Sequence, residues 1–225
     1  MPTGNVPSQL DQVYCNDEEL LVAASGDFWN LCPSWQKVAF GTDGYFNADD
    51  QWTLNSTAID FAAQGVQPNY VVMLSQGSGI GDFLAVDSVT GNSIVLRRPY
   101  MNLYAGQPYA PAVGLSGVKF EIRTLSPQIE EASYELNRRF TIDPVIFYRS
   151  PERIYDLRDL RMATVWTVLY NRYNQENRTN DGDFEKKTRH AGRQLATVME
   201  RVQVRWGPMG ASTEPTTLFN MKIST

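Results

Sequence analysis

Histidine and cysteine are scarce in this chain, whose 225 residues include one histidine and two cysteines. His190 stands among basic residues. A catalytic triad would need it to meet a nucleophile and a carboxylate, so we expect it on a helix surface instead. Cys15 and Cys32 lack zinc-ligand spacing, and a chain of this length needs no disulfide staple. We expect two buried thiols, with a disulfide between them as the alternative.

Long apolar runs are also missing. The longest runs, such as Tyr70–Leu74, are far shorter than the roughly 20 residues that a membrane helix needs. The N-terminal residues MPTGNVPSQLDQ contain no basic region followed by an apolar stretch, so no signal peptide is evident. We therefore expect synthesis in the cytosol and no membrane partner.

Positive charge is sparse in the first half of the chain. Residues 1–120 hold 4 Lys/Arg against 11 Asp/Glu, a net charge of −7, whereas residues 121–225 hold 16 against 14, a net charge of +2. The total of −5 gives no support to tight nucleic-acid binding, which depends on a basic stripe. Apolar residues make up 42% of the chain and charged residues 20%, as in an ordinary globular protein.

Three segments match catalytic or ligand-binding motifs only in part. GSGIGDF has Asp82 where the last glycine of a phosphate loop belongs, and a strand pattern follows it instead of a helix. GLSG, which begins at Gly114, is followed by Val118 where a nucleophile elbow needs glycine. NRTNDGD resembles the start of a calcium loop, but Thr188 stands where the loop needs glutamate. We predict no catalytic residue, no metal site and no cofactor, and we expect a protein that is not an enzyme.

The order of the predicted elements is more informative. We predict an α+β protein in which a helical bundle carries an inserted small antiparallel β domain, barrel- or sandwich-like, and an extended C-terminal arm. Residues 1–50 form an N-terminal arm and short helices that belong to the helical domain. Residues 51–125 form the inserted β domain, residues 126–206 the helical domain, and residues 207–225 the arm.

The β domain is predicted from short apolar runs that turn residues separate. The strand pattern begins at Trp52, after predicted turns at Gly41–Gly44 and Asn47–Asp50, and Gly91 and Asn92 suit a tight hairpin link. Because an isolated hairpin is marginally stable, several strands have to close or stack. The expected strands are Trp52–Leu54, Tyr70–Leu74, Phe83–Val89, Ile94–Arg97 and Val118–Leu125.

Helical periodicity precedes and follows this block. A short helix is expected over Asn16–Trp29, where Asn16 or Asp17 can cap the first turn. Ser126–Pro127 and Ser150–Pro151 each signal the start of a further helix, and Asp183 can cap the last one. The apolar stripe of that last helix has 4-3-4-3-4 spacing and consists of Phe184, Thr188, Ala191, Leu195, Val198 and Val202.

The C-terminal arm, GPMGASTEPTTLFNMKIST, is apolar near its end although it is too short to fold alone. In an extended chain Phe219, Met221 and Ile223 share one face. The arm either returns to the chain's own β block or adds to a neighbouring subunit or partner. The residues predicted to bind a partner are Leu218, Phe219, Met221 and Ile223.

Several segments together carry a resemblance to a known family. They are ELLVAASGDFWNLCP near the start, DFAAQGVQPNYVVML, GDFLAVDSV and NSIVLRR in the β block, and TLSPQIEEASYELNRRF and RVQVRWGP in the helical part. With the arm, they resemble the neck proteins of tailed bacteriophages, and in particular the head-to-tail adaptors that form a ring beneath the portal. The resemblance spans roughly Asp17–Ile223 and rests on composition rather than on one diagnostic motif.

The resemblance implies a non-enzymatic structural protein of the virion. Known adaptors are helical bundles assembled as twelve-fold rings, and a C-terminal extension commonly reaches the portal or neighbouring subunits. The implied partners are further copies of the chain, the portal protein and a downstream tail or neck protein. DNA would pass through the ring without specific binding. The implied location is the neck of the particle, after assembly in the host cytoplasm.

The long β insertion departs from the adaptor pattern and leaves other functions open. It could belong to a stopper, a tail terminator or a tail hub. A different class of protein, a ligand-binding β module, would place aromatic residues around a pocket. Those aromatics are dispersed and flanked by proline, which favours loop packing; they are Trp52, Tyr70, Tyr100, Tyr104 and Tyr109.

Overall fold

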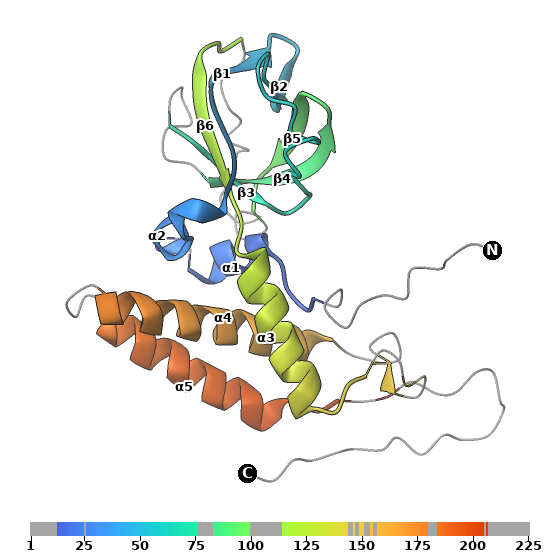
Figure 1. Cartoon of the computed structure of the whole chain (residues 1–225), viewed down its shortest axis with the longest axis vertical. Helices are drawn as coiled ribbons and strands as arrows, with labels where there is room; N and C mark the ends of the chain where they lie inside the picture. The colour runs from blue at the N-terminus through green and yellow to red at the C-terminus, as the bar shows by residue number, and fades with distance from the viewer. Residues whose placement is uncertain are drawn as a thin grey trace, which may run out of the picture. The chain divides into compact units, whose positions relative to one another are not determined.

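The computed structural model describes residues 13–24, 26–75, 83–99, 114–143, 146, 149–150, 154, 157–179, 184–204 and 206. The chain divides into two units, which we describe separately (Figure 1). The β unit is Asn16–Ser126, and the helical unit joins Met1–Cys15 to Pro127–Thr225. The protein is α+β, as predicted. The division differs from the predicted one, because residues 16–50 belong with the strands and not with the long helices.

The strands of the β unit close into an antiparallel barrel (Figure 1). Its closure depends on β6, which pairs with β3 on one side and with β1 on the other. Each strand pairs antiparallel with its neighbours around the barrel. In that order the strands are β1 (Lys37–Asn47), β2 (Asp50–Asn55), β5 (Ser93–Arg97), β4 (Phe83–Thr90), β3 (Val71–Leu74) and β6 (Val118–Arg123).

Side chains from alternate strand positions fill the barrel. In β6 the inward residues Val118, Phe120 and Ile122 are buried, whereas the residues between them face outward, as the two-residue period of a strand requires. Phe61, from the loop after β2, is fully buried, and its ring centroid lies 5.4 Å from that of Phe120. The barrel is therefore a packed core and resembles other small closed barrels in this respect.

Strand β1 corrects the prediction of a turn at Gly41–Gly44, whereas the predicted turn at Asn47–Asp50 is confirmed between β1 and β2. Its pairing with β6 shifts register between Gly41 and Gly44. A Cβ atom at Gly41 would lie 2.6 Å from the Phe120 ring, and one at Gly44 would lie 2.8 Å from the Val118 carbonyl oxygen. These glycines are present because two strands approach closely where the barrel closes, not because the chain turns.

Two short helices precede β1 within the β unit. Helix α1 (Asp17–Ala23) begins with a capping box, in which Asn16 and Glu19 each accept a hydrogen bond from the other's backbone amide. The chain leaves the helical path at Ala24, so the predicted Asn16–Trp29 helix is two helices, the second being α2 (Phe28–Leu31). The short 3₁₀ helix η1 (Ser34–Gln36) then leads into the barrel.

The helical unit contains α3 (Ser126–Arg139), which ends in a tight cap. Ile142 N donates to the Asn137 carbonyl at 2.8 Å and Thr141 N to that of Arg138 at 3.4 Å, while Thr141 has a φ of 56°. This is the Schellman arrangement, with threonine at the left-handed position where glycine is usual. Tyr14, Leu136, Phe140, Ile142 and Leu160 are among the buried residues of the core that forms around it.

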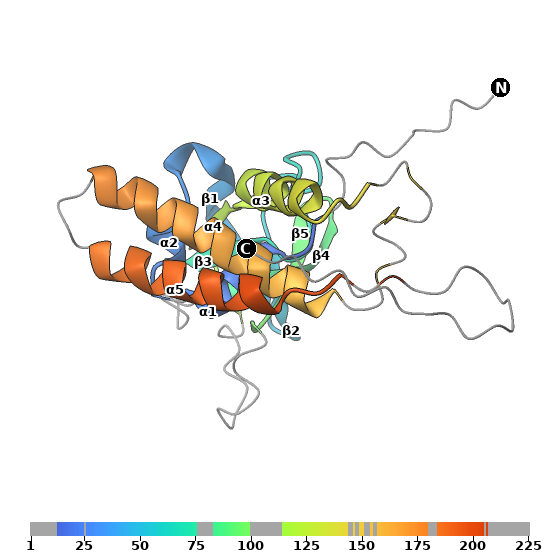
Figure 2. The ribbon, with the colours of Figure 1, turned by 90° about the horizontal axis from the view of Figure 1, so that it is seen from below.

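Helices α4 (Arg158–Thr179) and α5 (Glu185–Arg201) run side by side (Figures 1 and 2). Helix α4 begins at Arg158 and not at the predicted Ser150–Pro151 signal, because Ile154 is still extended and pairs with Trp206. Of the predicted α5 stripe, only Ala191 and Val202 are buried, and the rest of the stripe is intermediate in exposure. Asp183, the predicted cap, lies outside the described residues.

Candidate docking site

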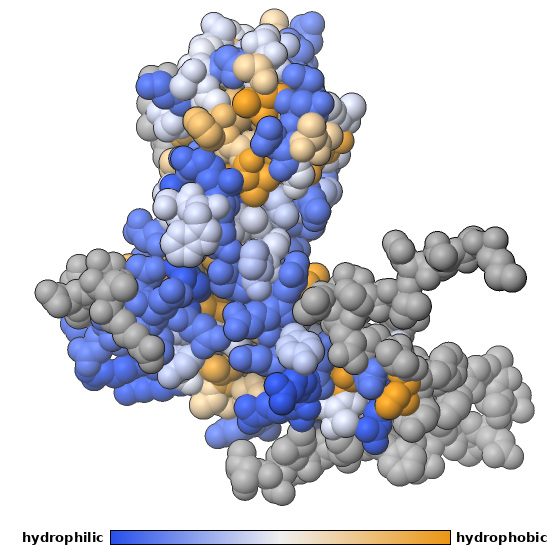
Figure 3. All heavy atoms as spheres, viewed as in Figure 1, coloured by the Kyte–Doolittle hydropathy of each residue, from blue (hydrophilic) through white to orange (hydrophobic). Residues whose placement is uncertain are grey.

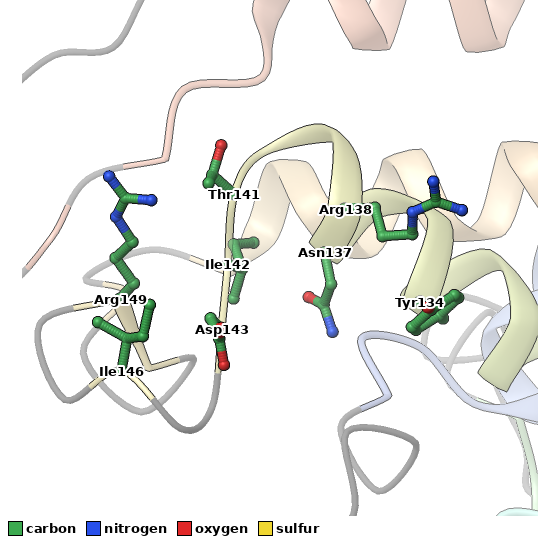
Figure 4. Close-up of a pocket in the computed structure, with 8 residues that line it drawn as sticks. All are labelled: Tyr134, Asn137, Arg138, Thr141, Ile142, Asp143, Ile146 and Arg149. Atoms are coloured by element: carbon green, nitrogen blue, oxygen red, sulfur yellow. The ribbon is translucent and has the colours of Figure 1, made fainter.

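A pocket of about 230 Å³ lies in the helical unit, at the C-terminal end of α3 (Figure 4). We call it the α3 pocket. One side comes from α3 itself and the other from the chain that follows it, as the labelled side chains in Figure 4 show. Its lining is mixed in polarity and consists of Tyr134, Asn137, Arg138, Thr141, Ile142, Asp143, Ile146 and Arg149.

The local backbone explains why a pocket forms there. The left-handed Thr141 turns the chain sharply back after α3, which carries Ile142 away from the helix axis. The chain then folds on itself, since Asp143 N donates to the Arg149 carbonyl at 2.9 Å and Arg149 N donates to that of Ile146 at 2.8 Å. The hollow is thus bounded by a capped helix end and a hydrogen-bonded loop.

A buried tyrosine supports the helix wall of the pocket. The Tyr14 hydroxyl donates to Asn137 Oδ1, and Tyr14 N donates to Ser133 Oγ at 3.3 Å. Burial raises the pKa of the Tyr14 phenol, so the hydroxyl keeps its proton and stays a donor. Asn137 is held from behind by this contact while it lines the pocket.

Apolar side chains and the Arg138 cation both line the pocket. Tyr134, Ile142 and Ile146 supply apolar surface, and Tyr134 is 37% exposed. The Arg138 guanidinium lies 6.0 Å from the centroid of the Tyr134 ring, at the outer limit of a cation–π contact. Such a site can take one apolar side chain together with an acidic neighbour.

The β unit carries a second exposed surface. Trp35 is 77% exposed and Phe40 is 63% exposed, and Lys37 Nζ lies 4.8 Å from the Phe40 ring centroid and 3.3 Å from Glu121. Figure 3 shows apolar residues gathered on the barrel face turned to the viewer. Exposed aromatic side chains beside charged ones are typical of protein contact surfaces.

Buried carboxylates in the β unit serve the fold. Asp17 accepts hydrogen bonds from Thr124 Oγ1 at 2.6 Å and from Leu125 N at 2.7 Å. Burial raises the pKa of Asp17 to about 7, although these two hydrogen bonds act in the opposite direction. A raised pKa of this kind is common in active sites, but here both contacts join α1 to the segment after β6 and so stabilise the fold of the β unit.

Hydrogen bonds also account for two acidic residues of the first strands, Asp43 in β1 and Asp50 at the start of β2. Burial acts to raise the pKa of Asp43, but hydrogen bonds from Ser56, Thr57 and Ala58 together outweigh it and lower the pKa to about 2. The hydrogen bond from the Thr53 side chain lowers the pKa of Asp50, with further help from backbone amides. Both carboxylates therefore stabilise turns as anions.

The predicted site residues fall in different places. Leu218, Phe219, Met221 and Ile223 lie outside the described residues, so their role stays a prediction. Trp52 and Tyr70 are half-buried and pack on the barrel core, while Tyr100, Tyr104 and Tyr109 lie outside the described residues.

The scarce residues noted at the outset lie where they were expected. His190 is exposed on α5, as predicted, with its ring edge-on to Trp166 at 5.8 Å. Cys15 and Cys32 are buried and are not joined by a disulfide, so the first of the two alternatives is confirmed. The Cys32 thiol donates to the Thr124 carbonyl at 3.2 Å.

Neither a metal-binding group nor a membrane-spanning helix is found in the described residues. In the described ranges, no three His, Cys, Asp or Glu side chains are grouped so that they could hold a metal ion. Nor does any helix in the described part of the chain have the length and apolar character to cross a membrane.

Comparison of the chain with protein families, with curated proteins and with solved structures finds no match. The assignment of function therefore depends on the residues themselves. The amino-acid sequence does not reveal the α3 pocket, because the defining feature of the pocket is the left-handed backbone conformation of Thr141. A threonine in the sequence does not signal that conformation.

Proposed function

We propose that this chain is a structural virion protein, a subunit of the ring that connects the portal to the tail of a bacteriophage. In this function it is a head-to-tail adaptor of the neck, assembled in the host cytoplasm. The sequence resemblance described above supports the proposal. The observation that carries it is the state of α5, an amphipathic helix whose apolar stripe is only partly covered by its own chain.

Helix α5 pairs with α4 but keeps part of its apolar stripe at the surface. Leu195, Val198 and Met199 are intermediate in exposure, while Ala191 is the buried residue of the helix. Apolar side chains left half-exposed along a helix suit packing against a neighbouring copy. A head-to-tail contact of this kind, repeated from copy to copy, gives a closed ring when the rotation between copies closes.

The charge distribution supports passage of DNA without specific binding. Between Lys37 and Arg97 the sequence contains six aspartates and no lysine or arginine. An acidic segment repels phosphate groups and offers no counter-charge to them. The proposed partners are further copies of the chain, twelve in a ring, the portal protein, and a tail or neck protein on the other side.

The barrel also supports a second candidate function, that of another structural protein of the phage neck or tail. A closed β-barrel on a helical frame departs from the simple helical adaptor, and it also suits a stopper, a tail terminator or a tail hub. The ligand-binding alternative has less support, because Phe46, Phe61 and Phe120 fill the barrel interior and Trp52 packs on it. All of the favoured candidates share the property of assembly through subunit contacts.

A matched pair of variants tests the role of α5. Leu195→Glu places a charge in the half-exposed stripe, whereas Thr197→Glu places the same charge two positions on, at an exposed site. We expect light scattering to show a large assembly for the wild type and for Thr197→Glu, and a single subunit for Leu195→Glu. Circular dichroism checks that both variants fold. Equal assembly of the two variants would overturn this role for α5.

A further inference from the structure

We propose that the α3 pocket binds a small carboxylate ligand. Asn137 and Arg138 bind its charged group. Tyr134 and Ile142 contact a short, branched apolar group that the carboxylate carries. The inference goes beyond the proposed function and does not depend on it, because the whole pocket belongs to the helical unit of one copy. Such a carboxylate can come from a free organic acid or from the end of a peptide chain.

The main indication of a ligand is the buried amide of Asn137. The residue is 4% exposed, and its Oδ1 accepts the hydrogen bond from the Tyr14 hydroxyl. Its Nδ2 has no acceptor among the described residues, yet this atom is not sealed from solvent. In Figure 4 the side chain extends from α3 into the space between Tyr134 and Asp143. A buried amide nitrogen that faces a pocket needs an acceptor there.

Tyr14 determines which end of the Asn137 amide faces the pocket. Burial raises the pKa of the Tyr14 phenol, so the hydroxyl remains a donor and needs an oxygen as its acceptor. The amide therefore keeps Oδ1 toward Tyr14 and presents the N–H groups of Nδ2 to the pocket. A site that offers donors selects an acceptor, and a carboxylate accepts a hydrogen bond more strongly than a neutral group does.

Arg138 supplies the charge that favours an anion. Its side chain is exposed, and in the described part of the chain no carboxylate pairs with it. The backbone carbonyls of Asn137 and Arg138 do not repel an anion as open acceptors. Both are taken up in the cap of α3 by the amides of Ile142 and Thr141. Two arginines and one aspartate line the pocket, so its net charge is positive.

The size of the pocket limits the rest of the ligand. Its volume of about 230 Å³ is below the roughly 300–1,000 Å³ of pockets that hold drug-sized ligands and cofactors. Tyr134, Ile142 and Ile146 supply the apolar part of the lining. A carboxylate with a short branched hydrocarbon group can therefore place its charge at Arg138 and bury its apolar part against these side chains.

Saturation-transfer difference NMR of isovalerate with the full-length chain tests the site. The method detects the ligand, so it suits a single subunit and a large assembly alike. We expect saturable binding with a Kd of roughly 0.1–10 mM, as for other ligands of so few atoms. Isovaleramide has the same shape without the charge and serves as the matched control. It should bind roughly fivefold more weakly or worse, because it offers Arg138 no anion.

Three variants of the chain test the residues. Asn137→Asp keeps an oxygen acceptor for Tyr14 but replaces the amide donors by a negative charge, and it should weaken isovalerate binding roughly tenfold or more. Arg138→Gln should weaken it roughly two- to fivefold, as expected for an exposed ion pair. Arg139→Gln makes the same change at an exposed position that does not line the pocket and should leave binding unchanged. Circular dichroism checks folding, and the arginine pair decides the result if Asn137→Asp does not fold.

A further probe distinguishes the two sources of the carboxylate. N-acetylvaline has the carboxylate and the branched group of isovalerate next to a peptide bond. Tighter binding of N-acetylvaline than of isovalerate would assign the site to the end of a peptide chain, and binding no tighter would assign it to a free acid.

Three results would overturn the inference. They are binding of isovalerate that does not saturate, equal binding of isovaleramide, and an equal effect of Arg138→Gln and Arg139→Gln. In each case the α3 pocket is not a carboxylate site. The proposed ring is measured separately, by light scattering, so either proposal can fail while the other stands.

Discussion

Both carboxylate oxygens of Glu18 accept hydrogen bonds from the Arg97 guanidinium, at 2.5 and 2.6 Å. The two residues lie far apart in the sequence, and the Glu18 side chain has no solvent exposure. Arg97 also donates to Asn69 at 2.7 Å and lies 3.2 Å from Asp87. This bidentate pair fixes α1 to β5, and it explains why the short N-terminal helix belongs to the β unit.

Removal of one partner of this pair should destabilise the β unit strongly. Glu18→Ala leaves Arg97 without its bidentate acceptor, and we expect a loss of about 3 kcal/mol in the free energy of unfolding. Lys37→Ala breaks the more exposed pair with Glu121 and should cost about 1 kcal/mol or less. Urea unfolding of the two variants measures both values. If Glu18→Ala lowers the free energy of unfolding no more than Lys37→Ala does, the Glu18–Arg97 pair does not hold α1 to β5.

Asp17 should make the folded protein less stable as the pH rises, whereas most carboxylates of folded proteins make it less stable as the pH falls. Its pKa is raised from 3.8 to about 7 in the folded chain, so between these values the folded state holds a proton that the unfolded state has lost. Stability should therefore fall as pH rises from about 4 to about 7. Asp17→Asn removes this dependence while it keeps an acceptor for Leu125 N and gains a donor for Thr124 Oγ1.

The measurement for Asp17 is the urea midpoint of wild type and Asp17→Asn at pH 5 and pH 8. We expect the Asn variant to gain relative to wild type at the higher pH. Asp43→Asn is the comparison, because the pKa of Asp43 is lowered to about 2 and its stabilisation is present at both pH values. A constant difference between wild type and Asp17→Asn would show that Asp17 titrates normally.

Replacement of Thr141, the left-handed residue at the end of α3, by glycine should increase the stability of the protein. A non-glycine residue in this conformation destabilises the folded state by roughly 1–2 kcal/mol. Glycine avoids this cost, but part of the gain is lost because glycine has more conformational freedom in the unfolded chain. We expect Thr141→Gly to raise the free energy of unfolding by roughly 0.5 kcal/mol. Thr197→Gly, at an exposed position inside α5, should lower it by a similar amount. Thermal unfolding of the two variants distinguishes the signs.

Glycine in β1 should resist substitution where the strands approach. Gly44→Ala places a methyl group 2.8 Å from the Val118 carbonyl oxygen, and the expected cost is about 1–3 kcal/mol. Gly26→Ala meets no atom within 4 Å and should be close to neutral. Equal stability of both variants in urea would mean that β1 can move away from β6 without loss.

Much of the barrel could be predicted from the sequence because its signals are local. Strands β3 to β6 follow runs of branched residues bounded by turns, and the hairpin at Gly91 is marked by its glycine. Strand β1 was missed because Gly41 and Gly44 are also turn residues in composition. Both strand positions need glycine because the Phe120 side chain, which is distant in the sequence, leaves no room for a Cβ atom there.

The remaining errors have the same cause. The place of α1 depends on contacts from Asp17 to Thr124 and from Glu18 to Arg97, and no periodicity reports such long-range pairs. The start of α4 depends on the pairing of Ile154 with Trp206. The α3 pocket depends on the backbone conformation of Thr141. Local patterns therefore predicted the elements, and contacts between distant residues decided their boundaries and grouping.

The most direct test of the central claim is the mass and shape of the purified full-length chain at increasing concentration. Light scattering after size-exclusion chromatography gives the mass, and negative-stain images give the shape. We expect rings with a central opening and a mass of twelve copies of the 25.4 kDa chain, about 305 kDa. A single 25.4 kDa species at every concentration, with no ring in the images, would contradict it.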